Sequence, residues 1–345
     1  MRDSTRARWG VALATGALVL SVAAPVAAQD GVQQIGYISP EEATDYGWNE
    51  QGLAGAEAAA ASVGGEVIQA DQAGYGDIAP ILNQMVDDGA DFVIAQASGY
   101  NAQAPAWAAE TGIPVVVFDA PDATTPGLVA NVSTNAYEGG YLAGVLAANQ
   151  TQTGILGLVL SANDVNWHKQ AGGFVAGAKS VNPDIQFQQA LIDEFGYGDA
   201  EGGNRVTSQV IAAGADIIFG MGNGSSFGML QAIENNTPEG ADQAWFIDVI
   251  GDKTSIDEQN VLLSSVLWDF AGTYEQAVAD IDAGTFGESG YTLDTANGGI
   301  ALLQTDNISD ETWAAVETAA AGIADGSIEV PVATSQEEVD ALIAG

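Results

Sequence analysis

The stretch from Asp45 to Gly52 groups side chains that could hold a small polar ring. It supplies a carboxylate (Asp45), a flat apolar indole (Trp48) and an amide that can donate and accept hydrogen bonds (Asn49). The stretch follows a short apolar run and precedes an alanine-rich segment, a pattern that predicts a buried strand and then a helix. Ligands of open α/β sheets bind at the carboxyl ends of strands. The stretch is therefore a candidate binding loop, although Asp45 or Asn49 could instead cap the helix.

Aromatic side chains form a second group of candidates. They stand in loops at the ends of predicted strands or in the turns just after them, where flat rings can stack on a sugar or a nucleobase. The group consists of Trp48, Tyr100, Trp167, Phe227 and Trp268. Two carboxylates, those of Asp45 and Asp119, could form an acid–base pair. In a chain with 46 acidic residues, however, carboxylates at strand ends are expected by chance.

Catalytic and metal-binding patterns are missing from the sequence. It contains one histidine, His168, and no cysteine, which are too few ligands for a usual zinc site. With one histidine, a His-Glu-x-x-His motif cannot occur. The glycine-rich run 220–225 resembles a phosphate loop but lacks the Gly-Lys-Ser/Thr ending. We interpret it as a loop that approaches the ligand closely and offers the Asn223 amide. We expect no enzyme activity, no metal and no cofactor.

Short apolar runs alternate along the chain with helical patterns of about ten residues. This alternation predicts βαβ units and doubly wound parallel sheets. One set of runs covers 35–38, 66–70, 91–95, 114–119 and 129–132, and a second set covers 155–160, 185–191, 215–220, 245–249 and 261–266. The expected fold class is α/β, with two doubly wound parallel-sheet lobes joined by a hinge. We place the N-terminal lobe at 29–150, the C-terminal lobe at 151–284, and a return crossing with a terminal helix at 285–345.

The N-terminus has the composition of a secretory signal peptide. Arg2, Arg6 and Arg8 precede an apolar run that is too short to span a membrane, and small residues follow up to Ala28. We expect residues 1–28 to be removed on export. The lack of cysteine excludes a lipid-modified cysteine at the cleavage point. The expected location is a Gram-negative periplasm, with free secretion as the alternative.

The remaining chain is strongly acidic. Removal of residues 1–28 leaves four cations against 45 carboxylates. Such a surface does not attract the phosphates of nucleic acids or anionic lipids. Its carboxylates repel one another at low ionic strength and are screened by salt, so the composition predicts a halophilic, salt-adapted protein. The alternative is a merely acidic soluble protein.

Several stretches, in order along the chain, resemble the basic membrane protein (BMP) family of ABC-transporter substrate-binding proteins, which includes Med-like and PnrA-like purine nucleoside receptors. They are 45–52, 98–100, 138–144, 173–184 and 214–216. The resemblance implies a type I periplasmic binding fold with three crossings between its lobes, and delivery of a ligand to an ABC permease. By position, Asp45, Trp48 and Asn49 match the base-contacting loop of the family, and Asp119 matches a cleft aspartate.

Two positions depart from the family pattern. Ile250 stands where a carboxylate for the ribose hydroxyls is usual, and Trp268 stands where a lysine often follows the next strand. Both departures weaken the case for ribose. The dipeptide Trp268-Asp269 is similar to the nucleobase-binding subgroup of the family.

The leading hypothesis is a monomeric, non-enzymatic binding protein of an ABC importer, specific for a purine nucleoside or nucleobase. Trp48 and Trp268 would stack on the ring. Its edge would meet Asn49, Asp45 and Asn223, while Asp119 and Asp252 would accept ring N–H or hydroxyl groups, and Tyr100, Trp167 and Phe227 complete the expected site. The alternatives are a monosaccharide or polyol carrier, an exported nucleosidase that uses Asp45 and Asp119, and a ligand-sensing partner of a membrane receptor.

Overall fold

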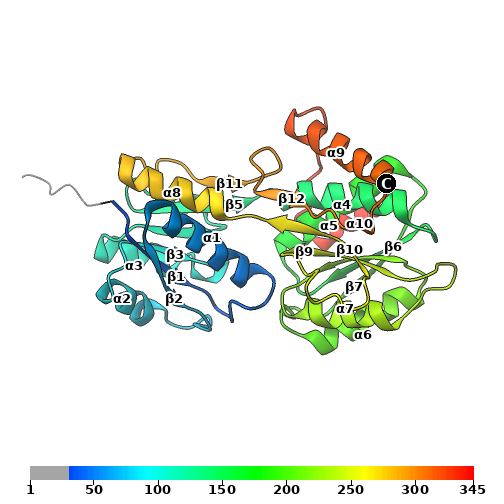
Figure 1. Ribbon diagram of the computed structural model, residues 1–345, viewed down its shortest axis with the longest axis horizontal. Helices are drawn as coiled ribbons and strands as arrows, with labels where there is room; N and C mark the ends of the chain where they lie inside the picture. The colour runs from blue at the N-terminus through cyan, green and yellow to red at the C-terminus, as the bar shows by residue number, and fades with distance from the viewer. Residues whose placement is uncertain (1–30) are drawn as a thin grey trace, which may run out of the picture. The chain divides into compact units, whose positions relative to one another are not determined.

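Residues 31–345 are described by the computed structural model of this chain. The expected signal peptide lies outside them, so its cleavage after Ala28 stays a prediction. The described residues form two α/β lobes, each with a six-stranded sheet between helices (Figure 1). The strands are β1 (Gln34–Ile38), β2 (Glu66–Ala70), β3 (Phe92–Ala95), β4 (Val115–Phe118), β5 (Val129–Thr134), β6 (Ile155–Leu160), β7 (Gln186–Leu191), β8 (Ile217–Met221), β9 (Trp245–Ile250), β10 (Leu262–Trp268), β11 (Tyr291–Leu293) and β12 (Ile300–Leu302). The helices are α1 (Trp48–Val63), α2 (Ala79–Asp87), α3 (Gln103–Thr111), α4 (Ala136–Gln150), α5 (Val165–Val181), α6 (Ala200–Ala212), α7 (Ser225–Asn235), α8 (Ala271–Ala283), α9 (Asp310–Ala324) and α10 (Gln336–Ala344), with short 3-10 helices η1 (Ser98–Tyr100) and η2 (Pro121–Ala123).

The first lobe is built on a parallel sheet with the strand order β11-β5-β4-β3-β1-β2. All residues of its inner strands β3 and β4 are buried, whereas the edge strand β2 is only partly buried. Successive side chains of a strand point to opposite faces. One face therefore packs against α1 and α8 and the other against α2 and α3 (Figure 1). Burial on both faces explains why the inner strands are continuous apolar runs.

The second lobe repeats this arrangement with the order β12-β10-β9-β8-β6-β7. All its strand pairs are parallel except β10–β12. Helices α4 and α5 cover one face together with α9 and α10, while α6 and α7 cover the other (Figure 1). In each lobe the order reverses next to the first strand, between β1 and β3 and between β6 and β8. The predicted pair of doubly wound parallel-sheet lobes is confirmed, and ligands of such sheets bind at these reversal points.

The chain passes between the lobes three times: after β5, after β10, and from β11 to β12. The crossing segments are hydrogen-bonded to one another. The backbone N–H of Asn135 donates to the carbonyl of Leu293 (2.8 Å), and that of Asp269 donates to the carbonyl of Gly299 (2.9 Å). The Glu138 carboxylate adds a bond from the backbone N–H of Thr295 (2.8 Å). The lobes are thus joined by three short segments that support each other.

The packing of α4 and α8 differs from the expected lobe limits at residues 150 and 284. Helix α4 packs against α5 and α9 in the second lobe, and α8 packs against α1 in the first, although α1 and α8 are far apart in sequence (Figure 1). The crossings at Asn135 and at Asp269 are too short to change the local composition. The expected limit between residues 150 and 151 falls in the turn from α4 to β6, within the second lobe.

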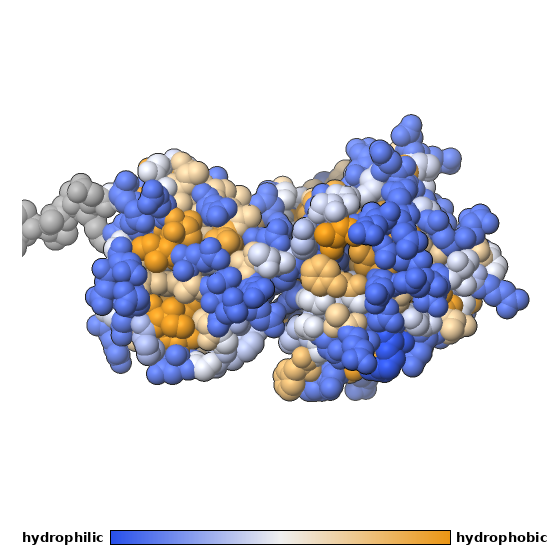
Figure 2. Space-filling model, turned by 60° about the horizontal axis from the view of Figure 1, so that its bottom comes forward, coloured by the Kyte–Doolittle hydropathy of each residue, from blue (hydrophilic) through white to orange (hydrophobic). Residues whose placement is uncertain are grey.

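Hydrophilic residues cover most of the face that Figure 2 displays, on both lobes. Among residues 31–345, none of the helices combines the length and the apolar character that crossing a bilayer requires.

Candidate functional site

The carboxyl ends of several strands from both sheets surround one cavity of about 460 Å³. The first lobe supplies the segments that follow β1, β2, β3 and β4, and the second lobe supplies those after β6, β7 and β8 with the ends of β9 and β10. The lining residues are Pro40, Glu41, Trp48, Asn49, Tyr75, Ala97, Ser98, Gly99, Asp119, Asp164, Asn166, Trp167, Phe195, Tyr197, Asn223, Ile250 and Trp268. The cavity lies where doubly wound sheets bind ligands.

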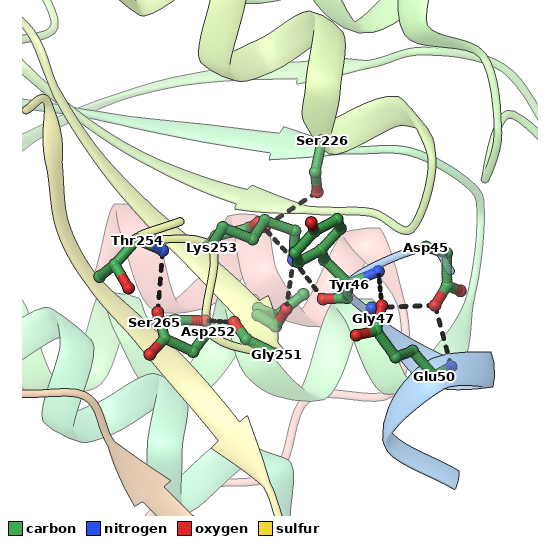
Figure 3. Close-up of polar contacts among 12 residues, drawn as sticks. Asp45, Tyr46, Gly47, Glu50, Ser226, Gly251, Asp252, Lys253, Thr254 and Ser265 are labelled. Carbon is green, nitrogen blue, oxygen red and sulfur yellow. Dashed lines mark hydrogen bonds and ion pairs between the residues drawn. The ribbon is translucent and has the colours of Figure 1, made fainter. Parts of the chain in front are cut away.

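Asp45 fixes the first turn of α1 and is not among the residues that line the cavity. Its carboxylate accepts hydrogen bonds from the backbone N–H groups of Gly47 (2.9 Å), Asn49 (3.2 Å) and Glu50 (3.0 Å), as Figure 3 shows in part. In return, the Glu50 carboxylate accepts from the backbone N–H of Tyr46 (2.8 Å). These contacts satisfy the free donors of the helix start. Asp45 thus has the capping role that the sequence left open as the alternative, and its contact with a ligand stays a prediction.

Four aromatic rings form one wall of the cavity and its support. The Trp48 ring meets the rings of Phe118, Trp268 and Phe270 edge to face, with centroids 5.0, 5.8 and 5.4 Å away. The indole N–H of Trp48 donates to the carbonyl of Gln96 (2.8 Å), which fixes the ring. Because Trp48 and Trp268 touch at an interplanar angle of 83°, they do not face each other across a planar ligand. Stacking of a ligand on either ring stays a prediction, but the two rings cannot enclose a planar ligand between them.

Two asparagines present amide oxygens without a protein partner. The side-chain N–H₂ of Asn49 donates to Asp45 (2.7 Å), and that of Asn166 donates to Asp119 across the lobes (3.3 Å). Within the described part of the chain, the Oδ1 atoms of Asn49 and Asn166 are buried and make no hydrogen bond. The same holds for Oδ1 of Asn223 and for the indole N–H of Trp268. All four residues line the cavity. Since buried polar atoms are normally paired, these atoms are candidates to contact a ligand.

The second lobe contributes a carboxylate and two rings held together by local bonds. Asp164 caps α5 by accepting from the backbone N–H of Asn166 (2.7 Å), and it also accepts from the Tyr197 hydroxyl (2.8 Å). Burial, followed by the Asp164 charge, raises the pKa of Tyr197, so this hydroxyl stays protonated as a donor. The indole N–H of Trp167 is bound to Ser161 (3.0 Å), which leaves the ring itself as the available surface.

The cavity is lined by carboxylates and not by cations. Glu41, Asp119 and Asp164 are among the lining residues, whereas no lysine or arginine of residues 31–345 is. Burial raises the pKa of Glu41, and the neighbouring Asp45 charge raises it further. An anionic ligand would find no compensating positive charge here.

A buried ion pair connects the second lobe to the loop before α1. The Lys253 ammonium lies 2.7 Å from an oxygen of Asp248, and both side chains are almost completely buried. Asp248 also accepts from the Ser226 hydroxyl (2.9 Å), while the ammonium donates to the carbonyl of Tyr46 in the first lobe (2.9 Å; Figure 3). Gly251 lies against the same carbonyl, where a Cβ would overlap it. Lys253 thus supports the start of α1 from across the lobes.

Ile250 ends β9 at the cavity with a φ of 73°. Positive φ is rare and strained for a β-branched residue and is found mostly at functional sites. Its side chain places an apolar group at the position where the family resemblance leads one to expect a ribose-binding carboxylate.

Six of the ten predicted site residues line the cavity: Trp48, Asn49, Asp119, Trp167, Asn223 and Trp268.

The other four predicted site residues do not line the cavity. The Tyr100 hydroxyl donates to the carbonyl of Gly74 (2.6 Å) and its ring is buried, and Phe227 packs edge to face on Tyr46 at the surface. Asp252 caps the turn at Thr254 (2.8 Å), and Asp45 caps α1.

Sequence reasoning missed several lining residues. Glu41, Tyr75 and Phe195 stand in loops whose direction depends on tertiary packing. Asp164 and Asn166 lie just before the predicted Trp167, in the segment between β6 and the first turn of α5, so their position was a usable signal. Within residues 31–345, no group of three or more potential metal ligands lies together.

The family described as "ABC transporter substrate-binding protein PnrA-like" has a model that matches residues 32–334. A "CD4+ T-cell-stimulating antigen" of Listeria monocytogenes is 30% identical over 215 residues, 59% of each chain. An "ABC transporter nucleoside-binding protein BmpA" of Lactococcus lactis is 31% identical over 207 residues, 56% of this chain and 58% of that one. The chain therefore spans somewhat under two thirds of these relatives.

Solved structures share the fold. A solute-binding protein of an ABC transporter system from Conexibacter woesei superposes with a TM-score of 0.72 at 19% identity, covering 87% of this chain and 99% of the other. At this identity the likeness is one of architecture: two parallel-sheet α/β lobes.

Proposed function

This chain belongs to the PnrA-like (BMP) family of ABC-transporter substrate-binding proteins, and we propose that it binds a purine nucleobase or nucleoside for an ABC importer. The observation that carries the proposal is the cavity itself. Three tryptophans line it together with unpartnered amide oxygens, and no cation does so among the described residues. Flat rings and a few fixed polar atoms are what a neutral heterocycle requires.

The apolar side chain of Ile250 in the cavity supports a free base over a nucleoside. Ribose hydroxyls buried against it would lose hydrogen bonds to water without replacement. The protein would act as an exported, monomeric carrier that passes its ligand to a permease and performs no chemistry on it. The alternative nucleosidase needs Asp45 and Asp119 as a pair at the ligand, but Asp45 is engaged by α1 and does not line the cavity.

Calorimetric titration and thermal melting of residues 29–345 in about 1 M NaCl test the proposal. The panel contains purine bases, their nucleosides and simple sugars. We expect a purine to raise the melting temperature, since a ligand at 100 times its dissociation constant adds about 2.7 kcal/mol. A response to sugars alone would support the carbohydrate alternative, and release of free base from a nucleoside would support the nucleosidase.

Asn223→Ala is the sharpest site variant. Within the described residues the Asn223 side chain makes no hydrogen bond, so its loss leaves the stability of the unliganded protein unchanged. We expect the dissociation constant to rise about 3- to 10-fold, the value of one hydrogen bond. Asn235→Ala, at the far end of the helix that follows Asn223, exposed and not among the lining residues, is the control. Equal affinity in the two variants would contradict the assignment of Asn223.

A further inference from the structure

We propose that the cavity selects ligands by an edge rich in N–H donors, because two carboxylates hold the Asn49 and Asn166 amides with their oxygens free to accept. This inference rests on the proposed function and specifies its ligand class: purines that carry an amino group are favoured over those that carry a carbonyl at the same ring position.

The orientation of each amide is fixed by its partner. A carboxylate only accepts hydrogen bonds, so the N–H₂ group of Asn49 must face Asp45, and that of Asn166 must face Asp119. Each Oδ1 is then the free atom, and both are buried without a partner among the described residues. Asn49 is only 1% exposed, which makes rotation to find water costly.

The two asparagines come from different lobes. Asn49 lies in the first turn of α1, and Asn166 lies in the first turn of α5. The bond between Asn166 and Asp119 joins the lobes, so the second amide is oriented by a carboxylate of the opposite lobe. Both asparagines line the same cavity, with Glu41 and Asp164 as additional residues that carry acceptors. The indole N–H of Trp268 is a buried unpartnered donor at the same cavity, and the Asn223 amide offers both a donor and an acceptor.

Because the lining side chains offer more hydrogen-bond acceptors than donors, the cavity distinguishes an amino group from a carbonyl. An amino group donates to the free oxygens, whereas a carbonyl opposes lone pair to lone pair and leaves both sides unpaired. Sites that bind a substrate N–H or O–H strongly reject analogues without it. The exocyclic groups of adenine and hypoxanthine differ in this way at C6, and those of guanine and xanthine differ at C2. In each pair the carbonyl member also carries a hydrogen on the adjacent ring nitrogen (N1 or N3), so it offers one N–H where the amino member offers two.

The experiment measures the dissociation constants of these two pairs by calorimetry, first on the wild-type protein. We expect the amino member of a pair that binds to be at least about tenfold tighter. Equal or tighter binding of the carbonyl member overturns the inference while the purine-binding function stands. If no purine binds, the proposed function fails, and the inference fails with it.

Asp119→Asn and Asp45→Asn test the role of the carboxylates. Asp119 has a φ of 55°, a conformation that asparagine tolerates well, so this variant is expected to fold. Each change releases the neighbouring amide to rotate, and the ratio between the amino and carbonyl members falls at least about threefold. Asp252→Asn replaces an exposed carboxylate outside the cavity and serves as the control. We expect it to leave the ratio of the two dissociation constants unchanged. An unchanged ratio in both test variants overturns the proposal.

Discussion

His168 is the single histidine of the chain and is buried in the helix that carries Trp167 and Asn166. Its Nε2 lies 2.9 Å from the amide oxygen of Asn163, and its Nδ1 is buried with no partner in the described residues. With Nε2 as the donor, Nδ1 is the site of protonation, where a new charge would be enclosed. Burial accordingly lowers the pKa of His168, and the Asp164 charge opposes this shift only in part.

The lowered pKa predicts a loss of stability in mild acid. As the pH falls below about 6.5, the unfolded chain gains a proton on His168 that the folded protein does not take up until its own lower pKa is reached. The free energy of unfolding falls between these two values, by about 1.4 kcal/mol for each pH unit that separates them. Proton NMR of the untagged protein should show one imidazole titrating below its usual range.

His168→Gln removes the titrating imidazole and leaves every carboxylate in place. Urea unfolding of both proteins at pH 7 and pH 5 isolates the contribution of the imidazole, because the acidic residues contribute equally to both. We expect the wild-type protein to lose stability relative to the variant at pH 5. A difference that is the same at both pH values would contradict the buried neutral imidazole.

Side-chain direction limited what could be predicted at the scale of residues. The sequence located the strand ends, and this was enough to select Asn49, Asp119 and Asn223 as neighbours of one cavity. It did not show that Asp45 turns inward to cap α1, or that the Tyr100 ring turns into the core of its lobe. Both outcomes depend on bonds that form only after the elements have packed.

The contact between α4 and α5 in the second lobe is close and depends on glycines. Gly140 and Gly144 in α4 lie against backbone carbonyls of α5, and Gly173 and Gly177 in α5 lie against carbonyls of α4. At each position a Cβ would overlap a carbonyl oxygen. Spacing by four residues places each pair on one helix face, which lets the two backbones approach closely.

Gly144→Ala should destabilise the protein. The added methyl group meets the carbonyl oxygen of Phe174, which cannot move without shifting α5, and such overpacking costs about 1–3 kcal/mol. Gly272→Ala in α8 is the matched control, because nothing lies within 4 Å of its added Cβ. We expect this control to stabilise the protein by about 0.4–1 kcal/mol through the unfolded state. Denaturant unfolding measures both, and similar effects of the same sign would contradict the close packing.

Elements were predictable where burial forces a continuous apolar pattern. Strands β1 to β10 came directly from such runs, whereas the three-residue strands β11 and β12 were not predicted. Helix α1 begins at Trp48, inside the stretch that the sequence presented as a loop before the helix. The first turn of α1 carries Trp48 and Asn49, polar and aromatic residues selected for the cavity and not for helix propensity. The lobe to which α4 belongs depends on which partner its glycine face meets, and composition does not encode that choice.

The charge of the whole molecule is carried almost entirely by carboxylates. Of the four cations in residues 31–345, Lys253 forms a buried ion pair with Asp248, and Lys179 donates to the carbonyls of Leu342 and Ile343 near the C-terminus. Half of the positive charge is therefore committed to fixed internal contacts. Hydrophilic residues extend over both lobes on the face seen in Figure 2.

This imbalance predicts that salt stabilises the fold. Mutual repulsion of carboxylates acts over about 30 Å at 0.01 M ionic strength but over only about 3 Å at 1 M. We expect the melting temperature at pH 7.5 to rise by at least about 4 °C between these NaCl concentrations, or about 2 kcal/mol. Most of the rise should occur below about 0.3 M, where the screening length changes fastest. A linear rise up to 1 M would indicate a general salting effect in place of screening, and a flat or falling curve would contradict the salt-adapted surface.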